Sequence, residues 1–427
     1  MTLRTRFDDL SELCRGLLLA AIERIETGVV FNPMAAGFRE NPYPFYRRLR
    51  ETDPFHKSRA ADGFVLSRHA DVMAVLRDPE FSSDERNQTR FPRMVARMAR
   101  AGVPDPYKDD SMSMLRLDPP DHTRLRGLVA KAFTPRAVER MRPRVEQTLK
   151  ELVESRPAHG AMELVREFAA PLPVRAIAEM LGIPPEDHER FRHWSDEIVR
   201  SLGDGTIEDR LAAERARGEL GRYFEAIVAA RRIAPRDDLI SALAEAEESG
   251  DRLRLSEMFA TLVLLLVAGN ETTTNLITNS MLALLQNPEQ LELLRRSPER
   301  IPAALEELLR FDSPVQLTSR IVTRDRELNG QPLRRGQQLV LLLGAANRDP
   351  AAFADPERLD VTRTDVRHLS FSHGIHFCLG AQLARLEGTL ALEALVTLYP
   401  KITLPPQKLV WRNNTILRGP KELWLEL

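Results

Sequence analysis

Apolar residues recur along most of this chain with the spacing of one face of an α-helix. This periodicity predicts helices over residues 135–152, 211–232, 255–286, 288–296, 302–310 and 379–398. Proline stands at the start of several of these segments, where its missing N–H leaves no hydrogen bond unmade. The chain is therefore expected to be mainly α-helical.

Strand-like alternation is confined to shorter segments. It predicts one strand in 63–69, two or more in 320–344 around a turn at Asn329–Gly330, and one in 413–427. Residues 116–126 and 346–363 are rich in proline and charge, and we expect ordered surface loops there. The whole pattern favours a mainly α fold with a minor β-sheet.

Composition narrows the class of protein. The 427 residues carry a net charge of -1, which argues against a surface for binding nucleic acid. Two cysteines, Cys14 and Cys378, do not make a disulfide framework, and this favours a reducing compartment. The most apolar run ends at Asn270, well short of the ~18 residues of a membrane span. We expect a cytoplasmic protein with no integral membrane segment.

The stretch FSHGIHFCLG, residues 371–380, holds the candidate chemistry. Cys378 has three interpretations. A buried cysteine often acts as a small hydrophobe. With His373 and His376 it is also a candidate zinc site, although side chains along an extended loop point to alternating sides and a zinc site needs a fourth ligand from elsewhere. The third interpretation is a ligand of iron.

Local physical chemistry favours the third interpretation. The segment after Cys378 predicts an amphipathic helix, so the thiol stands at a helix start, where free N–H groups are expected to lower its pKa. Gly374 and Gly380 permit unusual backbone angles and close approach to a flat cofactor. A thiolate on haem iron favours cleavage of the O–O bond.

The stretch FSHGIHFCLGAQLAR resembles the haem-binding loop of the cytochrome P-450 superfamily. The residues that match are Phe371, Gly374, His376, Cys378 and Gly380, whereas Ser372 replaces the usual glycine. The resemblance implies a cytochrome P-450 fold, with haem b held between the long central helix and the helix after the cysteine. It also implies that Cys378 is the axial ligand of the haem iron, that Phe371 and Gly380 contact the cofactor, and that His376 meets a propionate.

A second motif is AGNETTT, residues 268–274, within the longest predicted helix. Threonines inside helices often bond the carbonyl four residues back and bend the helix, and this alone is a structural interpretation. A bend near Gly269 is also expected to open a polar notch. The resemblance places Ala268 and Gly269 against haem, and it implies catalytic roles in activating dioxygen for Thr272 and Glu271.

Two further sets of residues occupy the family's positions. Glu307 and Arg310 are three apart on one helix, a spacing that by itself is typical of surface ion pairs contributing roughly 0–1 kcal/mol. The resemblance implies instead a buried structural pair completed by Arg363. Basic residues suit the two haem propionates. The resemblance assigns this role to His122, Arg126 and Arg320, together with His376.

The resemblance covers residues 31–427 as a single catalytic domain and leaves residues 1–30 as an extension of unknown role. It places substrate contacts at apolar positions, which suit a steroid, terpenoid, fatty acyl or polyketide substrate. These positions are Leu265, Val315, Leu317, Ile416 and Leu417, and each has ordinary core packing as its alternative.

A basic helix face is predicted at Arg90, Arg93, Arg97 and Arg100. Its simpler interpretation is the solvated side of an amphipathic helix. The alternative is a surface that attracts an anionic substrate or an acidic carrier protein.

The function that follows from the resemblance is hydroxylation or epoxidation of a hydrophobic small molecule by a haem-thiolate monooxygenase. No flavin or iron–sulfur segment is recognised in the chain, so a ferredoxin or flavodoxin with its reductase is the expected electron donor. Lys131, Arg124 and Arg385 are candidates for its docking charge. A peroxide-driven peroxygenase and a non-catalytic haem sensor are the alternative functions.

Overall fold

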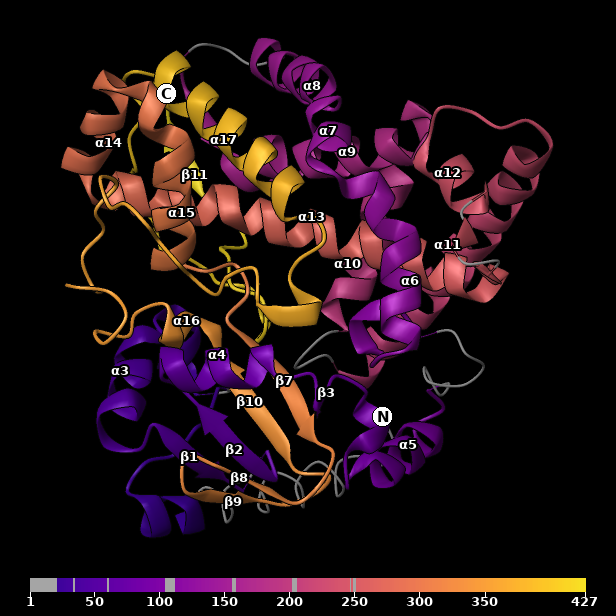
Figure 1. Ribbon diagram of the computed structural model, residues 1–427. Coiled ribbons are helices and arrows are strands. Elements are labelled where there is room, and N and C mark those ends of the chain that lie inside the picture. The colour runs from indigo at the N-terminus through magenta and orange to yellow at the C-terminus, as the bar shows by residue number, and fades with distance from the viewer. Residues whose placement is uncertain are drawn as a thin grey trace, which may run out of the picture.

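The computed structural model describes residues 21–33, 35–59, 61–103, 112–155, 159–201, 206–245, 247–248 and 251–427. Helices predominate, and a five-stranded sheet lies to one side of them (Figure 1). The predicted mainly α fold with a minor sheet is therefore confirmed. The helices are α2 (Ala36–Glu40), α3 (Tyr43–Thr52), α4 (His69–Arg77), α5 (Phe91–Arg100), α6 (Asp121–Ala130), α7 (Pro135–Glu139), α8 (Arg142–Glu154), α9 (Pro171–Leu181), α10 (His188–Arg200), α11 (Ile207–Ile233), α12 (Leu239–Glu245), α13 (Leu255–Gln286), α14 (Pro288–Arg296), α15 (Ile301–Phe311), α16 (Leu343–Ala346) and α17 (Ala381–Leu398).

The larger sheet has the strand order β1-β2-β10-β7-β3. Its strand β10 pairs in parallel with β2 and antiparallel with β7, so segments far apart in the sequence form its centre. The strands are β1 (Phe55–Ser58), β2 (Gly63–Leu66), β3 (Phe81–Ser82), β4 (Ala161–Glu163), β5 (Glu247–Glu248), β6 (Asp251–Arg252), β7 (Leu317–Val322), β8 (Arg326–Leu328), β9 (Gln331–Leu333), β10 (Gln338–Leu342) and β11 (Trp424–Glu426).

Helix α13 runs through the middle of the helical part of the molecule (Figure 1). It packs against α9, α10, α15 and α17. From Asn270 to Leu284 every side chain is buried except Thr272, which is partly exposed. Among the residues that the structure describes, α13 is the one helix long and apolar enough to cross a membrane. Packing on several sides gives a core helix the same all-round apolar character.

The predicted helices match the structure in most places. Helices α13 and α14 have the predicted bounds, and α17 begins two residues later than predicted. The segment 135–152 divides into α7 and α8. The predicted loop at 116–126 is wrong in its second half, where α6 begins at Asp121. Proline followed by an acidic residue in the first turn favours such a helix start.

The predicted regions contain strands, but the structure has more strands than were predicted. Residues 317–342 hold β7 to β10, and Asn329 and Gly330 form the predicted turn with φ of 50° and 76°. In 413–427 regular pairing is confined to β11, which pairs with β4. The remaining partners there are isolated bridges, such as Trp411 with Pro420.

Part of the predicted N-terminal extension is packed on the sheet. Glu23 is buried, and its carboxylate accepts hydrogen bonds from the backbone N–H of Phe31 (3.0 Å) and of Arg59 (2.8 Å). The ring of His56, on β1, lies between Glu23 and Asp53, at 2.8 Å from each. Cys14 lies outside the described residues, and the boundary at residue 30 stays a prediction.

Candidate active site

The loop from Phe371 to Gly380 carries Cys378 to the start of α17. The backbone N–H of Cys378 donates to the carbonyl oxygen of Phe371 (2.9 Å), which closes the loop on itself. Gly374 has a φ of 71°, and a Cβ there would lie 2.1 Å from the carbonyl oxygen of Leu76. Only glycine therefore fits at Gly374 without moving the backbone.

Two other positions of the loop differ from expectation. Ser372 has a φ of 61°, in the left-handed region, so the family's glycine is replaced at a position where glycine is favoured. Gly380 has a φ of -84°, which any residue adopts, and the expected special backbone angle is wrong there. A Cβ on Gly380 would meet no atom within 4 Å, so the space beside it is open.

The thiol of Cys378 does not have the lowered pKa that the helix start predicted. Burial raises the pKa of Cys378, and this effect outweighs the backbone N–H of Gly380 and the charges of Arg126 and Arg385, which act in the opposite direction. The prediction failed because it counted the helix start and left out desolvation. A thiol that coordinates a metal loses its proton because of the charge of the ion.

Four predicted basic residues come together beside the loop. His122 and Arg126 lie on α6, Arg320 on β7 and His376 in the loop itself. The ring centroids of His122 and His376 are 4.3 Å apart, and Arg126 donates to the carbonyl oxygen of Phe377 (2.7 Å). Burial, together with the charges of Arg320, His122 and Arg126, lowers the pKa of His376 to about 3.

This basic cluster fits an anionic cofactor. Within the described residues, no carboxylate forms an ion pair with Arg126 or Arg320, although Arg320 is only 6% exposed. Neither ring nitrogen of His122 has a hydrogen-bond partner there, and neither has Nε2 of His376. Buried cations and donors without partners are costly. Two propionates would supply the missing partners, so the residues fit haem.

The motif AGNETTT lies on α13, which continues through it without a break. The hydroxyl of Thr272 donates to the carbonyl oxygen of Ala268 (2.7 Å), as predicted for a threonine inside a helix. Ala268 is exposed, and a Cβ on Gly269 would meet nothing within 4 Å. The helix therefore has an open surface at Ala268, Gly269 and Thr272, next to its fully buried half.

Glu271 is buried and has a partner that the sequence did not predict. Its Oε1 lies 2.7 Å from Nε of Arg412, a residue of the C-terminal segment. Neither atom forms a hydrogen bond of good geometry, so the contact is an ion pair. Burial raises the pKa of Glu271, the charge of Arg412 opposes this rise, and the charge of Asp196 adds to it.

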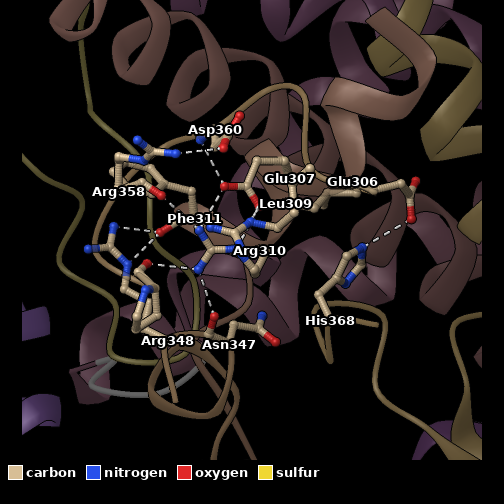
Figure 2. Close-up of polar contacts among 12 residues, drawn as sticks. Glu306, Glu307, Leu309, Arg310, Phe311, Asn347, Arg348, Arg358, Asp360 and His368 are labelled. Atoms are coloured by element: carbon tan, nitrogen blue, oxygen red, sulfur yellow. Dashed lines mark hydrogen bonds and ion pairs between the residues drawn. The ribbon is translucent and has the colours of Figure 1, made fainter. Parts of the chain in front are cut away.

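The predicted pair Glu307–Arg310 is buried, with both side chains 0% exposed. Figure 2 shows the polar contacts around this pair. The guanidinium of Arg310 donates to both carboxylate oxygens, at 2.6 and 2.8 Å, and Nε of Arg363 lies 3.2 Å from the same carboxylate. Arg310 also donates to the carbonyl oxygens of Asn347 and Pro356. The network ties α15 to the loop that precedes the cysteine, and the surface interpretation is excluded.

The predicted substrate residues come together only in part. Val315 and Leu417 form an antiparallel bridge, and the backbone N–H of Gln316 donates to the carbonyl oxygen of Ile416 (2.8 Å). Leu317 is partly buried at the start of β7. Leu265 belongs to a hydrophobic core between α13 and α9 to α12, where core packing explains it.

Three other predictions concern surfaces and metals. Arg124 pairs with Glu257, and Arg385 pairs with Glu306 at 2.7 Å, so two of the three candidate docking charges are already neutralised. Lys131 is exposed. In the part of the chain that the structure describes, no group of three His, Cys, Asp or Glu residues is placed to hold a metal ion, which gives the zinc interpretation no support.

The predicted basic face on α5 has the expected arrangement. Arg93, Arg97 and Arg100 are exposed, whereas Arg90 pairs with Asp62 (2.9 Å). The apolar side chains of the opposite face are half-buried, as in an ordinary amphipathic surface helix. That this face binds an anionic partner stays a prediction.

Comparisons with known proteins identify the family of the chain. The family model described as Cytochrome P450 matches residues 207–426. The chain is 38% identical over 408 residues to the polyketide biosynthesis cytochrome P450 PksS of Bacillus subtilis (strain 168), covering 93% of this chain and 99% of that protein. It is 41% identical over 400 residues to the vitamin D(3) 25-hydroxylase of Pseudonocardia autotrophica, covering 92% and 96%.

Solved structures show the same fold. The structure of PksS has a TM-score of 0.85 and covers 93% of this chain and 100% of its own. A structure of P450BioI in complex with hexadec-9Z-enoic acid ligated acyl carrier protein has a TM-score of 0.83 at 34% identity, covering 92% and 100%. The cysteine loop, the basic cluster and these similarities lead to one conclusion: the chain belongs to the cytochrome P450 family of haem b monooxygenases.

Proposed function

We propose that this chain inserts one oxygen atom from dioxygen into an apolar small molecule, by hydroxylation or epoxidation, with electrons from a ferredoxin or flavodoxin and its reductase. The observation that carries the proposal is the basic cluster of His122, Arg126, Arg320 and His376, in which no arginine forms an ion pair with a carboxylate of the described residues. The cluster lies beside a cysteine held at the start of α17. Haem b bound through Cys378 supplies the activation of dioxygen.

The chain's own residues have distinct parts in this proposal. Cys378 provides the sulfur ligand, and Phe371 and Gly380 contact the cofactor. Gly380 leaves open space beside the loop for a flat ring system, whereas Gly374 lets the loop pass close to the backbone of Leu76. The propionates are held by the basic cluster of His122, Arg126, Arg320 and His376. Arg310, with Glu307 and Arg363, keeps the preceding loop in place.

Proton supply is assigned to α13. The Thr272 hydroxyl donates its hydrogen to the Ala268 carbonyl. The hydroxyl oxygen therefore remains able to accept a hydrogen bond on the open side of the helix. Glu271 is the adjacent acid, and its burial keeps a proton available closer to neutral pH than in water.

For the substrate we propose a chemical class, not a single compound. Val315, Leu317, Ile416 and Leu417 offer an apolar lining from two segments that the structure joins. One relative is named for vitamin D(3), and one structural neighbour carries a fatty acid on a carrier protein. Both compounds are largely apolar, which supports an apolar substrate of the steroid, terpenoid, fatty acyl or polyketide type. A cytoplasmic location is part of the same proposal.

Two measurements test this function. The reduced protein treated with carbon monoxide is expected to show the strongly red-shifted Soret band of thiolate-bound haem, and Cys378→Ser is expected to lose it. With a bound apolar substrate, Thr272→Ala is expected to lower the ratio of product to reductant consumed by about a hundredfold, the lower end of what a positioned acid–base group contributes. Thr278→Ala, which removes a similar back-bond (3.0 Å) further along α13, is the matched control.

The results that contradict the proposal are specific. Absence of the red-shifted band in the wild type removes the thiolate assignment. Unchanged coupling in Thr272→Ala removes the assignment of that residue. Product formation with peroxide alone, and none with reductant and dioxygen, identifies a peroxygenase.

A further inference from the structure

A charged cluster lies against the cysteine loop, and the oxygen chemistry proposed above does not use it. Its members are Glu306 on α15, His368 in the segment before the loop and Arg385 on α17. The guanidinium of Arg385 donates to both carboxylate oxygens of Glu306, at 2.7 and 2.8 Å. Figure 2 shows His368 turned toward Glu306, with Nε2 of the ring 3.2 Å from a carboxylate oxygen. Three separate segments of the chain therefore meet at one carboxylate.

Hydrogen bonds fix His368 in one tautomer. The backbone N–H of Ser370 donates to Nδ1 of His368 (3.1 Å), so Nδ1 carries no hydrogen and Nε2 is the donor to Glu306. The side chain of His368 is 3% exposed. Burial alone would raise the pKa of Glu306, but the hydrogen bonds of Arg385 and His368 lower it to about 2. Glu306 is therefore a fixed negative charge at neutral pH, and it holds the guanidinium of Arg385 in place.

The cluster also contacts the loop that carries the cysteine. The guanidinium carbon of Arg385 lies 4.6 Å from the centroid of the Phe371 ring, and the centroid of the His368 ring lies 5.7 Å from the same point. The carbonyl oxygen of Phe371 accepts the backbone N–H of Cys378 (2.9 Å). The cluster thus packs on the residue to which the cysteine is hydrogen-bonded.

The charge of Arg385 reaches the sulfur as well. The charges of Arg126 and Arg385 both act on Cys378 and favour its anionic form. Arg126 belongs to the basic cluster that two propionates are proposed to neutralise, which leaves Arg385 as the remaining one of these two cations. A cation near a ligand sulfur stabilises the state of the bound metal that holds one more electron.

We propose that Arg385 is a positioning residue that raises the reduction potential of haem bound through Cys378, and that Glu306 and His368 fix its guanidinium for this purpose. The equilibrium concerned is the one-electron reduction of ferric to ferrous haem, and the ferredoxin or flavodoxin supplies the electron. Arg385 acts through its charge and through Phe371, without contact with the iron. This inference rests on the proposed function, because it requires Cys378 as the sulfur ligand and an external electron donor.

The test is the midpoint potential of the haem-loaded protein, measured by titration with dithionite in the presence of redox dyes and without substrate. Arg385→Gln removes the cation and leaves Glu306 charged. The equilibrium constant for reduction is expected to fall about tenfold, the lower end of the effect of a nearby opposite charge on a protonation equilibrium. For one electron this is a shift of about 59 mV to lower potential. Arg385→Lys keeps the charge and is expected to restore most of the wild-type value.

The carboxylate partner separates an effect of charge from structural damage. Glu306→Gln leaves Arg385 charged without its counter-ion, so the potential is expected to shift upward. A loosened cysteine loop is expected instead to shift the potential in the same direction in Arg385→Gln and Glu306→Gln. Arg334→Gln is the matched control, because Arg334 is an exposed arginine next to β9 that also pairs with a carboxylate, Asp325 (2.7 Å). Its potential is expected to equal that of the wild type.

The results that overturn the inference are an unchanged potential in Arg385→Gln and a downward shift in both variants. If Arg385→Gln binds no haem, Glu306→Gln decides by itself: an upward shift supports the inference, and an unchanged or lower potential overturns it. When the inference fails but the wild type shows the red-shifted Soret band with carbon monoxide, the proposed function stands. A wild type without that band removes the proposed function and the inference together.

Discussion

The buried carboxyl of Glu387 offers a quantitative test of the packing around the cysteine helix. Glu387 lies on α17, is 2% exposed, and has the side chain of Thr273 on α13 as its hydrogen-bond partner. Burial raises its pKa to about 8, and the hydrogen bond with Thr273 only partly opposes this. The side chain is therefore expected to be a neutral acid at pH 7. Glu387→Gln keeps the size and polarity of the group and removes its titration.

The magnitude follows from the difference between the folded and unfolded chains. Between the ordinary value of 4.5 and about 8, the folded protein holds a proton that the unfolded chain has released. The free energy of unfolding of the wild type therefore falls as pH rises, by about 1.4 kcal/mol per pH unit for this group. From pH 4.5 to about pH 8 the free energy of unfolding of the wild type is expected to fall by on the order of 4 kcal/mol. The Glu387→Gln variant does not show this fall, because glutamine does not titrate.

The assay is urea unfolding followed by far-UV circular dichroism at pH 5, 6, 7 and 8, with equal haem content in each protein. The variant is expected to match the wild type near pH 5 and to become progressively more stable than it toward pH 8. Glu186→Gln, which changes an exposed carboxylate, is the control. A stability difference that stays flat from pH 5 to pH 8 would refute the reasoning, because it would mean that Glu387 titrates alike in both states.

Three other predictions concern stability and local order. Glu307→Gln is expected to lower the free energy of unfolding by about 3–5 kcal/mol, because Arg310 keeps a buried charge without its partner; a loss below 1 kcal/mol in urea unfolding contradicts this. Ser372→Gly is expected to raise the free energy of unfolding by about 0.5–1 kcal/mol. A left-handed backbone is more costly for serine than the extra loss of chain entropy on folding is for glycine. A decrease in the free energy of unfolding contradicts this. Burial alone would lower the pKa of His56, but its hydrogen bonds with Glu23 and Asp53 raise it above 6.5. Protection of residues 21–33 from hydrogen exchange is therefore expected to be full near pH 6 and to fall as pH rises through the raised pKa of His56; protection independent of pH, or equal in His56→Gln, contradicts this.

Local features of the chain were predictable because they depend on neighbours in the sequence. The bounds of α13 and α14, the Asn329–Gly330 turn and the position of Cys378 before a helix follow from periodicity and from the conformational preferences of single residues. The back-bond of Thr272 to Ala268 is of the same kind, since both groups lie on one turn of helix.

Resemblance to a family supplied what local patterns do not contain. Nothing in the spacing of Glu307 and Arg310 distinguishes a buried pair from an exposed one, yet both side chains have no exposed surface. The four residues of the basic cluster come from α6, β7 and the cysteine loop, and no sequence pattern joins such distant segments.

The sequence by itself determined which chemical groups are present. These are a thiol at a helix start, an acid next to a hydroxyl on a long helix, and enough basic residues to bind an anionic cofactor. Tertiary structure alone decided the electrostatic state of those groups. Burial raised the pKa of Cys378 where the helix start predicted a decrease, and folding brought Arg412 to Glu271 and the Thr273 side chain to Glu387. Desolvation and long-range ion pairs depend on what surrounds a side chain in space, and only the packed chain specifies those surroundings.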